Sequence, residues 1–513
     1  MLTGLDYAVL VLYTIGVAIF GIRAGGKQHT MEDYFVGNRQ LPWWAVCFSV
    51  VATETSTLTV IGIPAVAYLG NLTFLQITFG YILGRILVSL YFLPRYYEGK
   101  LLTAYAFLET RFGRRMQVAA AGTFQVTRLL ADGVRLFATA IPIKVVLDMS
   151  GLSLAYWEII ILIGLVTIVY TYLGGIRAVV WMDVVQLGVY LGGALLAAVL
   201  LLMHLGLDWW PVAEQAGKTR LLYLGLDLPF SEWLTRPYTL PTAVLGGAAL
   251  SMASHGTDQL IVQRLLACRN VRDSQKALIT SGVVVMLQFL VFLIVGLLLW
   301  VFYQGASLAE LGLTRADEIF PRFIIEGLPP GISGLVIAGI IAAAMSTLSS
   351  SLNALASSSV VDFLVPRSKR LREDAPYALR VSRLATLVWG LVFMLFANLF
   401  TNQENPVIEL GLSIASFTYG GLLGVFLLGV LNTRVREGAA LIAFVVALIT
   451  MIWVIFGIWY GKDGNWYFVF YPSDETIQAL ELRAIAWPWY TIIGTLLTVS
   501  VGSLLTLVQR RRG

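Results

Sequence analysis

The hydroxyl-rich stretch AMSTLSSSLNALASSS follows directly on the apolar run GISGLVIAGIIAA. In this stretch Ser346, Ser349 and Ser350 are spaced by three and four residues, so on a helix they share one face. Thr347 is adjacent, and the carbonyl group of Ala343 lies one turn earlier. A hard cation such as sodium takes oxygen ligands of this kind. The stretch predicts either a sodium site or a packing face of small residues that lets two helices approach closely.

A carboxylate strengthens the first interpretation. The segment YLGGIRAVVWMDVVQ places Asp183 at the start of an apolar helix. An ionised side chain that enters such a helix needs a partner. Arg177 is one candidate for this partner because it is close in sequence. The other candidate is a cation held between Asp183 and the serine face.

Two apolar segments are interrupted by polar residues near their middle: VVATETSTLTVIG, residues 50–62, and SMASHGTDQLIVQR, residues 251–264. Clustered polar groups at that depth usually face a cavity or a bound ion. The two breaks lie five expected helices apart, so the segments cross the membrane in opposite directions. Paired breaks in opposed halves are typical of inverted-repeat secondary transporters. The alternative is two kinked helices whose hydroxyl groups bond to their own carbonyl groups.

Three charged residues stand close together in the apolar segment FQVTRLLADGVRLF. Asp132 is four residues after Arg128 and three before Arg135, so on a helix it can neutralise either arginine. The alternative is that one arginine faces a cavity and binds a carboxylate through two parallel hydrogen bonds. The spacing leaves both interpretations open, and it does not decide which arginine faces the cavity.

The composition indicates the elements that must position these residues. The chain of 513 residues is 58% hydrophobic and 13% charged, whereas soluble domains carry about 25% charged residues. We therefore predict an all-α polytopic membrane protein. Thirteen apolar runs are long enough to span a bilayer, at 5–22, 43–69, 73–95, 117–147, 155–174, 179–204, 241–266, 276–303, 331–363, 379–400, 406–431, 437–460 and 486–507.

The basic residues predict the orientation of these helices. Alternate loops and the C-terminal QRRRG are rich in Arg and Lys, whereas the three longer loops, at 205–240, 304–330 and 461–485, are much less basic. The positive-inside rule then places the N-terminus outside and the C-terminus in the cytoplasm. The net charge of +5 gives no indication of nucleic-acid binding, because the basic residues lie between apolar runs.

The chain resembles the sodium/solute symporter family over nearly its whole length. The resemblance is carried by DYFVGNRQLPWW, IGIPAVAY, TAYAFLETRFG, YLGGIRAVVWMDVVQ, DQLIVQR and GVFLLGVL. The stretch VATETSTLTVIGIPAVAY is most similar in pattern to bacterial sialic acid transporters. The resemblance implies one transmembrane domain, 1–513, with the 5+5 inverted-repeat amino-acid-transporter fold. Its expected parts are an extra N-terminal helix at 5–22, repeats at 43–204 and 241–431, and two C-terminal helices at 437–507.

The same resemblance implies binding residues. The general sodium site would use the carbonyl groups of Ala52, Thr55 and Ala343 and the hydroxyl groups of Ser346 and Thr347. A second sodium site, present in some members, matches Asp183, Ser346, Ser349 and Ser350. The substrate region would include Ser56, Thr59, Thr78, Ser254 and His255, together with Arg128 or Arg135.

The departures from the family pattern bear on the substrate. The glucose members use an Asn and a His in the first break and a Tyr-Trp pair in the second. This chain has Glu54 and Thr59, then Ser254 and His255, at the matching places. The missing sugar-binding set and the arginines favour a carboxylate-bearing solute, such as sialic acid or a monocarboxylate. A sugar or a proline-like amino acid is the alternative substrate.

The expected function is sodium-coupled symport in the cell (plasma or inner) membrane, with two sodium ions per substrate molecule. The expected partners are the substrate, sodium ions and the lipid bilayer, and the protein is expected to be a monomer without an organic cofactor. A membrane enzyme or a channel is the distant alternative. The sequence contains no HExxH, GxSxG or Walker motif, and its three histidines lack metal-ligand spacing. We therefore expect no enzymatic activity.

Overall fold

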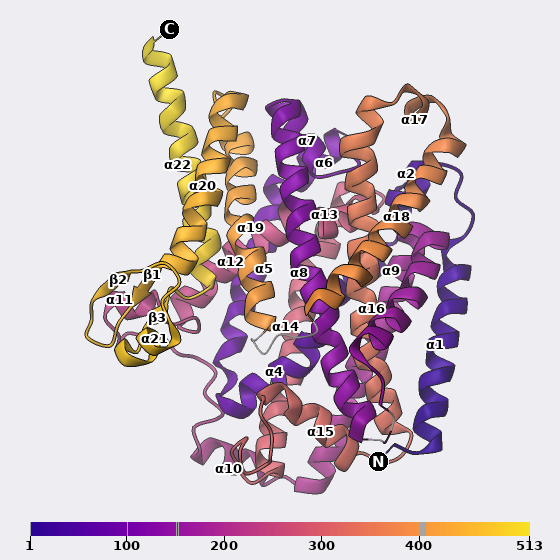
Figure 1. Ribbon diagram of the computed structural model, residues 1–513, viewed down its shortest axis with the longest axis vertical. Helices are drawn as coiled ribbons and strands as arrows, with labels where there is room; N and C mark the ends of the chain where they lie inside the picture. The colour runs from indigo at the N-terminus through magenta and orange to yellow at the C-terminus, as the bar shows by residue number, and fades with distance from the viewer. Residues whose placement is uncertain (1, 100, 150, 152, 401–406, 513) are drawn as a thin grey trace. The chain divides into compact units, whose positions relative to one another are not determined.

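The computed structural model describes residues 2–99, 101–149, 151, 153–400 and 407–512 (Figure 1). They form two compact units, each assembled from three stretches of the chain. The first unit comprises Met1–Leu75, Arg128–Leu221 and Gln263–Ile408. The second comprises Gln76–Thr127, Leu222–Val262 and Glu409–Gly513.

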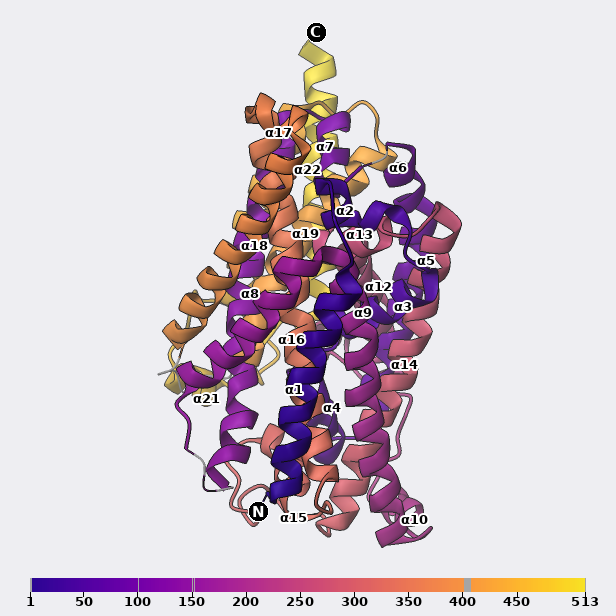
Figure 2. The ribbon, with the colours of Figure 1, turned by 90° about the vertical axis from the view of Figure 1, so that its right-hand side faces the viewer.

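The first unit contains both the serine-rich helix and the first broken segment. Its helices, two of which begin in the second unit, are α1 (Gly4–Gly25), α2 (Met31–Val36), α3 (Trp43–Glu54), α4 (Thr57–Leu69), α8 (Arg114–Met149, from Arg128 onward), α9 (Tyr156–Leu205), α10 (Trp209–Gln215), α13 (Gln259–Leu266, from Gln263 onward), α14 (Val271–Phe302), α15 (Ile319–Glu326), α16 (Ile332–Ser358), α17 (Lys369–Glu373) and α18 (Ala375–Ala397). Helix α16 packs against α9 and α1, and Figure 2 shows α1 running along α16.

Helix α9 is a single label for the two helices expected at 155–174 and 179–204. Its 50 residues would measure about 75 Å if straight, more than twice the hydrocarbon thickness of a bilayer. The two halves meet at Gly175, whose φ of +55° is left-handed and unfavourable for other residues. A side chain here would also come within 2.5 Å of the Tyr34 carbonyl oxygen. The kink therefore fixes where one pass ends and the next begins.

The N-terminal helix is bound to α16 by one buried carboxylate. Asp6 Oδ1 accepts hydrogen bonds from the backbone N–H groups of Gly331 and Gly334, at 2.7 and 2.8 Å. These N–H groups lie at the start of α16, where a helix leaves its first donors without internal partners. Asp6 Oδ2 accepts from Thr3 at the start of α1. Asp6 on α1 thus caps the start of α16, which lies more than 320 residues later in the sequence.

The second unit combines helices with a small sheet. Its helices are α5 (Gln76–Tyr91), α6 (Leu93–Glu98), α7 (Tyr105–Arg111), the first part of α8, α11 (Phe230–Trp233), α12 (Leu240–Gly256), the first part of α13, α19 (Val407–Leu431, from Glu409 onward), α20 (Glu437–Gly457), α21 (Asp474–Leu480) and α22 (Pro488–Arg512). Strands β1 (Ile458–Tyr460), β2 (Trp466–Phe468) and β3 (Arg483–Ala484) form an antiparallel sheet in the order β2-β1-β3. Helices α20 and α22 pack side by side (Figure 1).

The membrane character of the chain is visible in its helices and its exterior. Among the described residues, eight helices are long and apolar enough to cross a membrane, or nine when α3 and α4 form one bent span. The other expected ranges are helical too, but α8 is charged and α12 ends after 17 residues. The count of thirteen therefore stays a prediction. Large apolar side chains such as Leu12 on α1 and Leu395 on α18 are exposed, at 71% and 73%, as a lipid-facing surface requires.

Candidate functional site

The first expected break lies between α3 and α4, whose axes bend by 67°. Ser56 caps α4 together with Thr59, since the Ser56 backbone N–H donates to Thr59 Oγ1 at 3.3 Å and the two hydroxyl oxygens are 3.5 Å apart. Gln288 on α14 donates to Thr55 Oγ1 at 2.7 Å. The break is therefore a helix end and a helix start, each with its own hydrogen-bond partners.

Helix α16 meets this break on both sides. Before the break, Thr53 Oγ1 lies 3.1 Å from Ser350 Oγ. After it, Thr57 Oγ1 donates to the carbonyl oxygen of Ile340 at 3.0 Å. Ala52 lies beside the first contact, and Thr55 lies between the two. The carbonyl groups at the end of a helix have no internal partners, so those of α3 end close to α16.

The expected ligands on α16 itself are close together. Thr347 Oγ1 donates to the carbonyl oxygen of Ala343 at 3.2 Å. The hydroxyl groups of Ser349 and Ser350 both donate to the carbonyl oxygen of Ser346, at 3.1 and 2.6 Å. A hydroxyl group that donates its proton to a carbonyl oxygen keeps its lone pairs on the outer side. The serine face is thus a row of oxygen acceptors inside a fully buried helix surface.

Asp183 on α9 points at this face. Its Oδ1 accepts from Ser346 Oγ at 2.6 Å, and its Oδ2 accepts from Ser49 Oγ on α3 at 2.5 Å. Asp183, Ser346 and Ser350 have no measurable exposure. Three helices that are distant in sequence therefore bring one carboxylate and several hydroxyl groups to one buried place.

The charged partner of Asp183 is not the arginine suggested by sequence proximity. Arg177 Nη2 instead donates to Gln40 Oε1 at 3.1 Å. The buried partner is Arg264, whose Nη2 lies 3.3 Å from Asp183 Oδ2. Arg264 Nη2 also donates to Ser350 Oγ, and its Nε donates to Ser49 Oγ at 3.0 Å. Arg177, one of the two candidate partners, is therefore excluded because its side chain is bound at the kink of α9.

Sequence reasoning missed Arg264 and Ser49. Both carried a signal, although a weak one. Arg264 is a lone charge within the apolar run LIVQRLLA, and such a charge needs a buried partner. Ser49 is one turn before Thr53, so both hydroxyl groups lie on one face of α3, where Ser49 contacts Asp183 on α9 and Thr53 contacts Ser350 on α16.

The arginines of α8 surround one carboxylate. Arg128 Nη1 lies 3.4 Å from both oxygens of Asp132, and Arg135 Nη1 lies 3.2 Å from Oδ1. The Arg128 side chain is 4% exposed and that of Arg135 is 23% exposed. Ser351 on α16, which sequence reasoning also missed, donates to Asp132 Oδ2 at 2.6 Å. The cluster is therefore tied to the helix that carries the serine face.

The remaining expected site residues belong to the second unit. Thr78 is buried in α5. Ser254 and His255 end α12, where Ser254 Oγ lies 2.8 Å from His255 Nδ1 and donates to the carbonyl oxygen of Leu250 at 2.9 Å. The second break follows them, and Asp258 caps α13 through the Leu260 N–H at 2.9 Å. The structure thus confirms a helix break at each of the two expected places.

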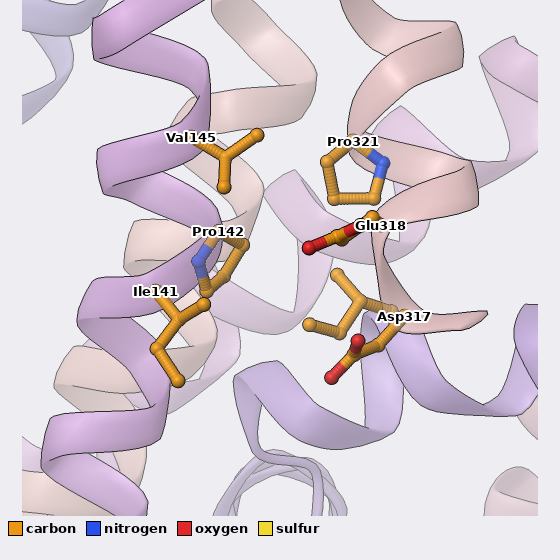
Figure 3. A pocket seen from close by; sticks show the side chains of 7 residues that line it. Ile141, Pro142, Val145, Asp317, Glu318 and Pro321 are labelled. Carbon is orange, nitrogen blue, oxygen red and sulfur yellow. The ribbon is translucent and has the colours of Figure 1, made fainter. Parts of the chain in front are cut away.

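A small hollow beside α4 is not a substrate site. It is lined by apolar residues of α4, α8 and α15 and by Asp317 and Glu318, which face Ile141 and Pro142 (Figure 3). Its volume of about 10 Å³ corresponds to a single water molecule. An organic solute does not fit there.

Comparisons with known proteins agree with this architecture. Residues 34–447 match the sodium:solute symporter family model. The chain is 30% identical to the sodium/sialic acid symporter NanT of Aliivibrio fischeri, over 98% of this chain and 92% of the relative. It is 29% identical to the human sodium/iodide cotransporter, over 93% of this chain and 72% of the relative.

Among solved structures, a substrate-bound, outward-open sodium-coupled sialic acid symporter, described as revealing a novel sodium site, matches with a TM-score of 0.83. The sequence identity is 26%, over 99% of this chain and 98% of that chain. These matches confirm the transporter fold and a function in transport, not enzymatic catalysis. The chain belongs to the sodium:solute symporter family and is a multi-pass membrane protein that couples the transport of a small solute to sodium ions.

Proposed function

We propose that the protein imports a carboxylate-bearing solute, with sialic acid as the first candidate, together with two sodium ions. The NanT relative and the sialic acid symporter structure support this substrate class, because sialic acid carries a carboxylate. The sodium/iodide cotransporter also carries an anion. A shared negative charge is what these substrates have in common.

The observation that carries the proposal is the pair of arginines on α8. Burying a carboxylate at membrane depth is prohibitive without a cationic partner. Arg128 and Arg135 both approach Asp132 Oδ1, at 3.4 and 3.2 Å. These distances are longer than the 2.7–2.9 Å that is typical of charge-assisted hydrogen bonds. A guanidinium group is a planar fork of N–H donors that matches the two oxygens of a carboxylate. We assign the substrate carboxylate to Arg128, the more deeply buried of the two.

Other polar residues, at the two breaks and in α5, are proposed to bind the remainder of the substrate. In the first unit these are Ser56 and Thr59, whose hydroxyl groups face each other at the start of α4. In the second unit they are Thr78, Ser254 and His255. Hydroxyl and imidazole groups suit a polyhydroxylated acid because they can both donate and accept hydrogen bonds.

Two sodium sites are proposed on α16. The general site uses the carbonyl groups of Ala52, Thr55 and Ala343 with the hydroxyl groups of Ser346 and Thr347. Its support is the approach of the α3 end to α16. The second site uses Asp183, Ser346, Ser349 and Ser350. Its support is the buried carboxylate that already accepts from Ser346 at 2.6 Å.

The proposal extends to the setting of the protein. We place it as a monomer in the cell (plasma or inner) membrane, with one domain over 1–513. The basic loops and the C-terminal QRRRG support a cytoplasmic C-terminus and an external N-terminus. The exposed apolar side chains of α1 and α18 support direct contact with lipid.

Counterflow in proteoliposomes tests the function. Vesicles loaded with unlabelled sialic acid should accumulate labelled sialic acid when sodium is present, and much less when potassium replaces it. Short monocarboxylates, iodide, proline and glucose serve as competitors. Competition by carboxylates but not by glucose supports the proposal. Sodium-dependent counterflow of glucose, with none of sialic acid, of a short monocarboxylate or of proline, would refute the assigned substrate class.

A further inference from the structure

A fully buried arginine beside the proposed second sodium site has no role yet in the proposed function. Arg264, on the last turn of α13, has no measurable side-chain exposure. Its Nη2 lies 3.3 Å from Asp183 Oδ2 and also donates to Ser350 Oγ. Its Nε donates to Ser49 Oγ at 3.0 Å. The cationic group therefore rests on one carboxylate and two hydroxyl groups.

These oxygens are what a sodium ion would use at the proposed second site. Asp183 and Ser350 belong to that site, and Ser49 binds the same carboxylate oxygen as Arg264. Asp183 provides a single negative charge. A sodium ion placed beside Arg264 would leave an excess positive charge among desolvated groups, which is strongly unfavourable. The guanidinium group and the sodium ion therefore compete for the same carboxylate.

We propose that Arg264 is a tethered counter-ion that occupies Asp183 when sodium is absent and withdraws when sodium binds at the second site. This inference rests on the proposed second sodium site. A symporter must return to its starting state after releasing sodium, and a buried carboxylate without a partner is costly at that stage. Arg264 supplies the missing charge, so Asp183 stays neutralised in both halves of the cycle.

The geometry of the pair suits exchange. The separation of 3.3 Å is longer than the 2.7–2.9 Å of tight charge-assisted bonds. The Nε–H group donates to the Ser49 hydroxyl group, a neutral partner. Arg264 lies on an eight-residue helix that follows the second break. A short helix next to a break can shift its end without unfolding a long segment.

The competition predicts a measurable effect on sodium affinity. The apparent dissociation constant equals the intrinsic one divided by the fraction of protein in the binding-competent state. If the guanidinium group occupies Asp183 about 90–99% of the time, it weakens sodium binding about 10- to 100-fold. Replacing Arg264 with a neutral residue should remove this competition.

The test is a sodium titration of the purified full-length protein without substrate. The thermal unfolding temperature is measured at each sodium concentration. Potassium keeps the ionic strength constant. Arg264→Gln should be less stable than wild type in potassium, since it leaves Asp183 unpaired. Sodium should restore its stability, with a half-saturating concentration at least about 10-fold below that of wild type.

Three further variants make the result specific. Arg177→Gln removes an arginine bound at the α9 kink and should leave the sodium titration unchanged. Arg264→Lys keeps the charge and should give an intermediate half-saturating concentration. The double variant Asp183→Asn with Arg264→Gln removes both charges. It should be more stable in potassium than Arg264→Gln alone, and it should lose the additional sodium stabilisation.

Two outcomes would overturn the inference while leaving the proposed function intact. One is an Arg264→Gln variant that is destabilised equally in sodium and potassium. The other is an unchanged or higher half-saturating sodium concentration in both Arg264 variants. Either result would make the ion pair purely structural. A wild-type protein that shows no preference for sodium over potassium, in unfolding or in uptake, would instead overturn the proposed function itself.

Discussion

Replacing Arg128 with lysine separates a substrate-binding arginine from a structural one. Lysine keeps the positive charge near Asp132, but its ammonium group is a point charge and cannot form two parallel bonds to a carboxylate. Arg128 is held at 3.4 Å from both Asp132 oxygens, and the proposal places the substrate carboxylate on the same guanidinium group. Losing one buried charge-assisted hydrogen bond costs about 1.5–3 kcal/mol. This corresponds to about 10- to 150-fold weaker substrate binding.

The assay is sodium-dependent uptake of sialic acid into proteoliposomes, measured over a range of substrate concentrations. We expect the apparent affinity of Arg128→Lys to fall by the factor given above. Sodium stabilisation without substrate, measured by thermal unfolding, should stay close to that of wild type. A loss confined to the substrate would distinguish a binding role from general misfolding.

Arg135→Lys is the matched control on the same helix. Arg135 is 23% exposed and lies 3.2 Å from Asp132 Oδ1. Partly exposed ion pairs contribute about 0.2–1 kcal/mol, so this variant should lose less than about 5-fold in affinity. If both variants retain wild-type affinity, or if the transported ligand is an uncharged sugar, the cluster is structural. A larger loss in Arg135→Lys than in Arg128→Lys would reassign the carboxylate to Arg135.

Four further predictions concern sodium and stability. Ser346→Ala and Thr347→Ala should each raise the half-saturating sodium concentration for uptake strongly, and uptake that ran equally well on potassium or a proton gradient would contradict this. Asp183→Asn should reduce the Hill coefficient for sodium toward one. A wild-type Hill coefficient of one, with a single charge moved per cycle, would contradict the second sodium site. Ser351→Ala removes the 2.6 Å bond to Asp132, leaving that carboxylate to pair more closely with Arg128, so substrate affinity should fall while sodium stabilisation persists; unchanged affinity would argue against this link. Asp6→Ala should destabilise the protein by about 2–4 kcal/mol through the lost cap of α16, and an unfolding temperature equal to that of wild type would show that water replaces the carboxylate.

The positions of most helices along the chain could be predicted from the sequence because a membrane-spanning segment has a distinct local composition. An apolar run of sufficient length is helical whatever its neighbours are, since its backbone must satisfy its own hydrogen bonds in lipid. Both breaks were predictable for a similar reason, because Thr, Ser, His and Asp interrupt those runs. The sheet of β1, β2 and β3 was not expected, since its two- and three-residue strands are too short to leave a pattern.

The partners inside the candidate site were harder to predict because they depend on contacts between distant helices. Asp183 clearly needed a partner, and proximity in sequence suggested Arg177. The observed partner, Arg264, is 81 residues away and reaches Asp183 only because α13 and α9 lie together. Ser351 is similar, since nothing in its own segment distinguishes its hydroxyl group from those of Ser349 and Ser350. Single-sequence patterns identify which residues need partners, whereas the fold decides which partners they receive.

The hydroxyl groups of α16 bind different partners. Ser346 and Ser350 face the pair of Asp183 and Arg264, while Ser351, one residue further on, binds Asp132 of the arginine cluster. Successive residues on a helix point about 100° apart. One face of α16 therefore contacts the Asp183–Arg264 pair, and a neighbouring face contacts Asp132. A small rotation or shift of α16 would change the hydrogen bonds of both carboxylates together. The oxygen-rich stretch is therefore suited to connect sodium binding with the charge of the proposed substrate site, which is the physical requirement of coupled transport.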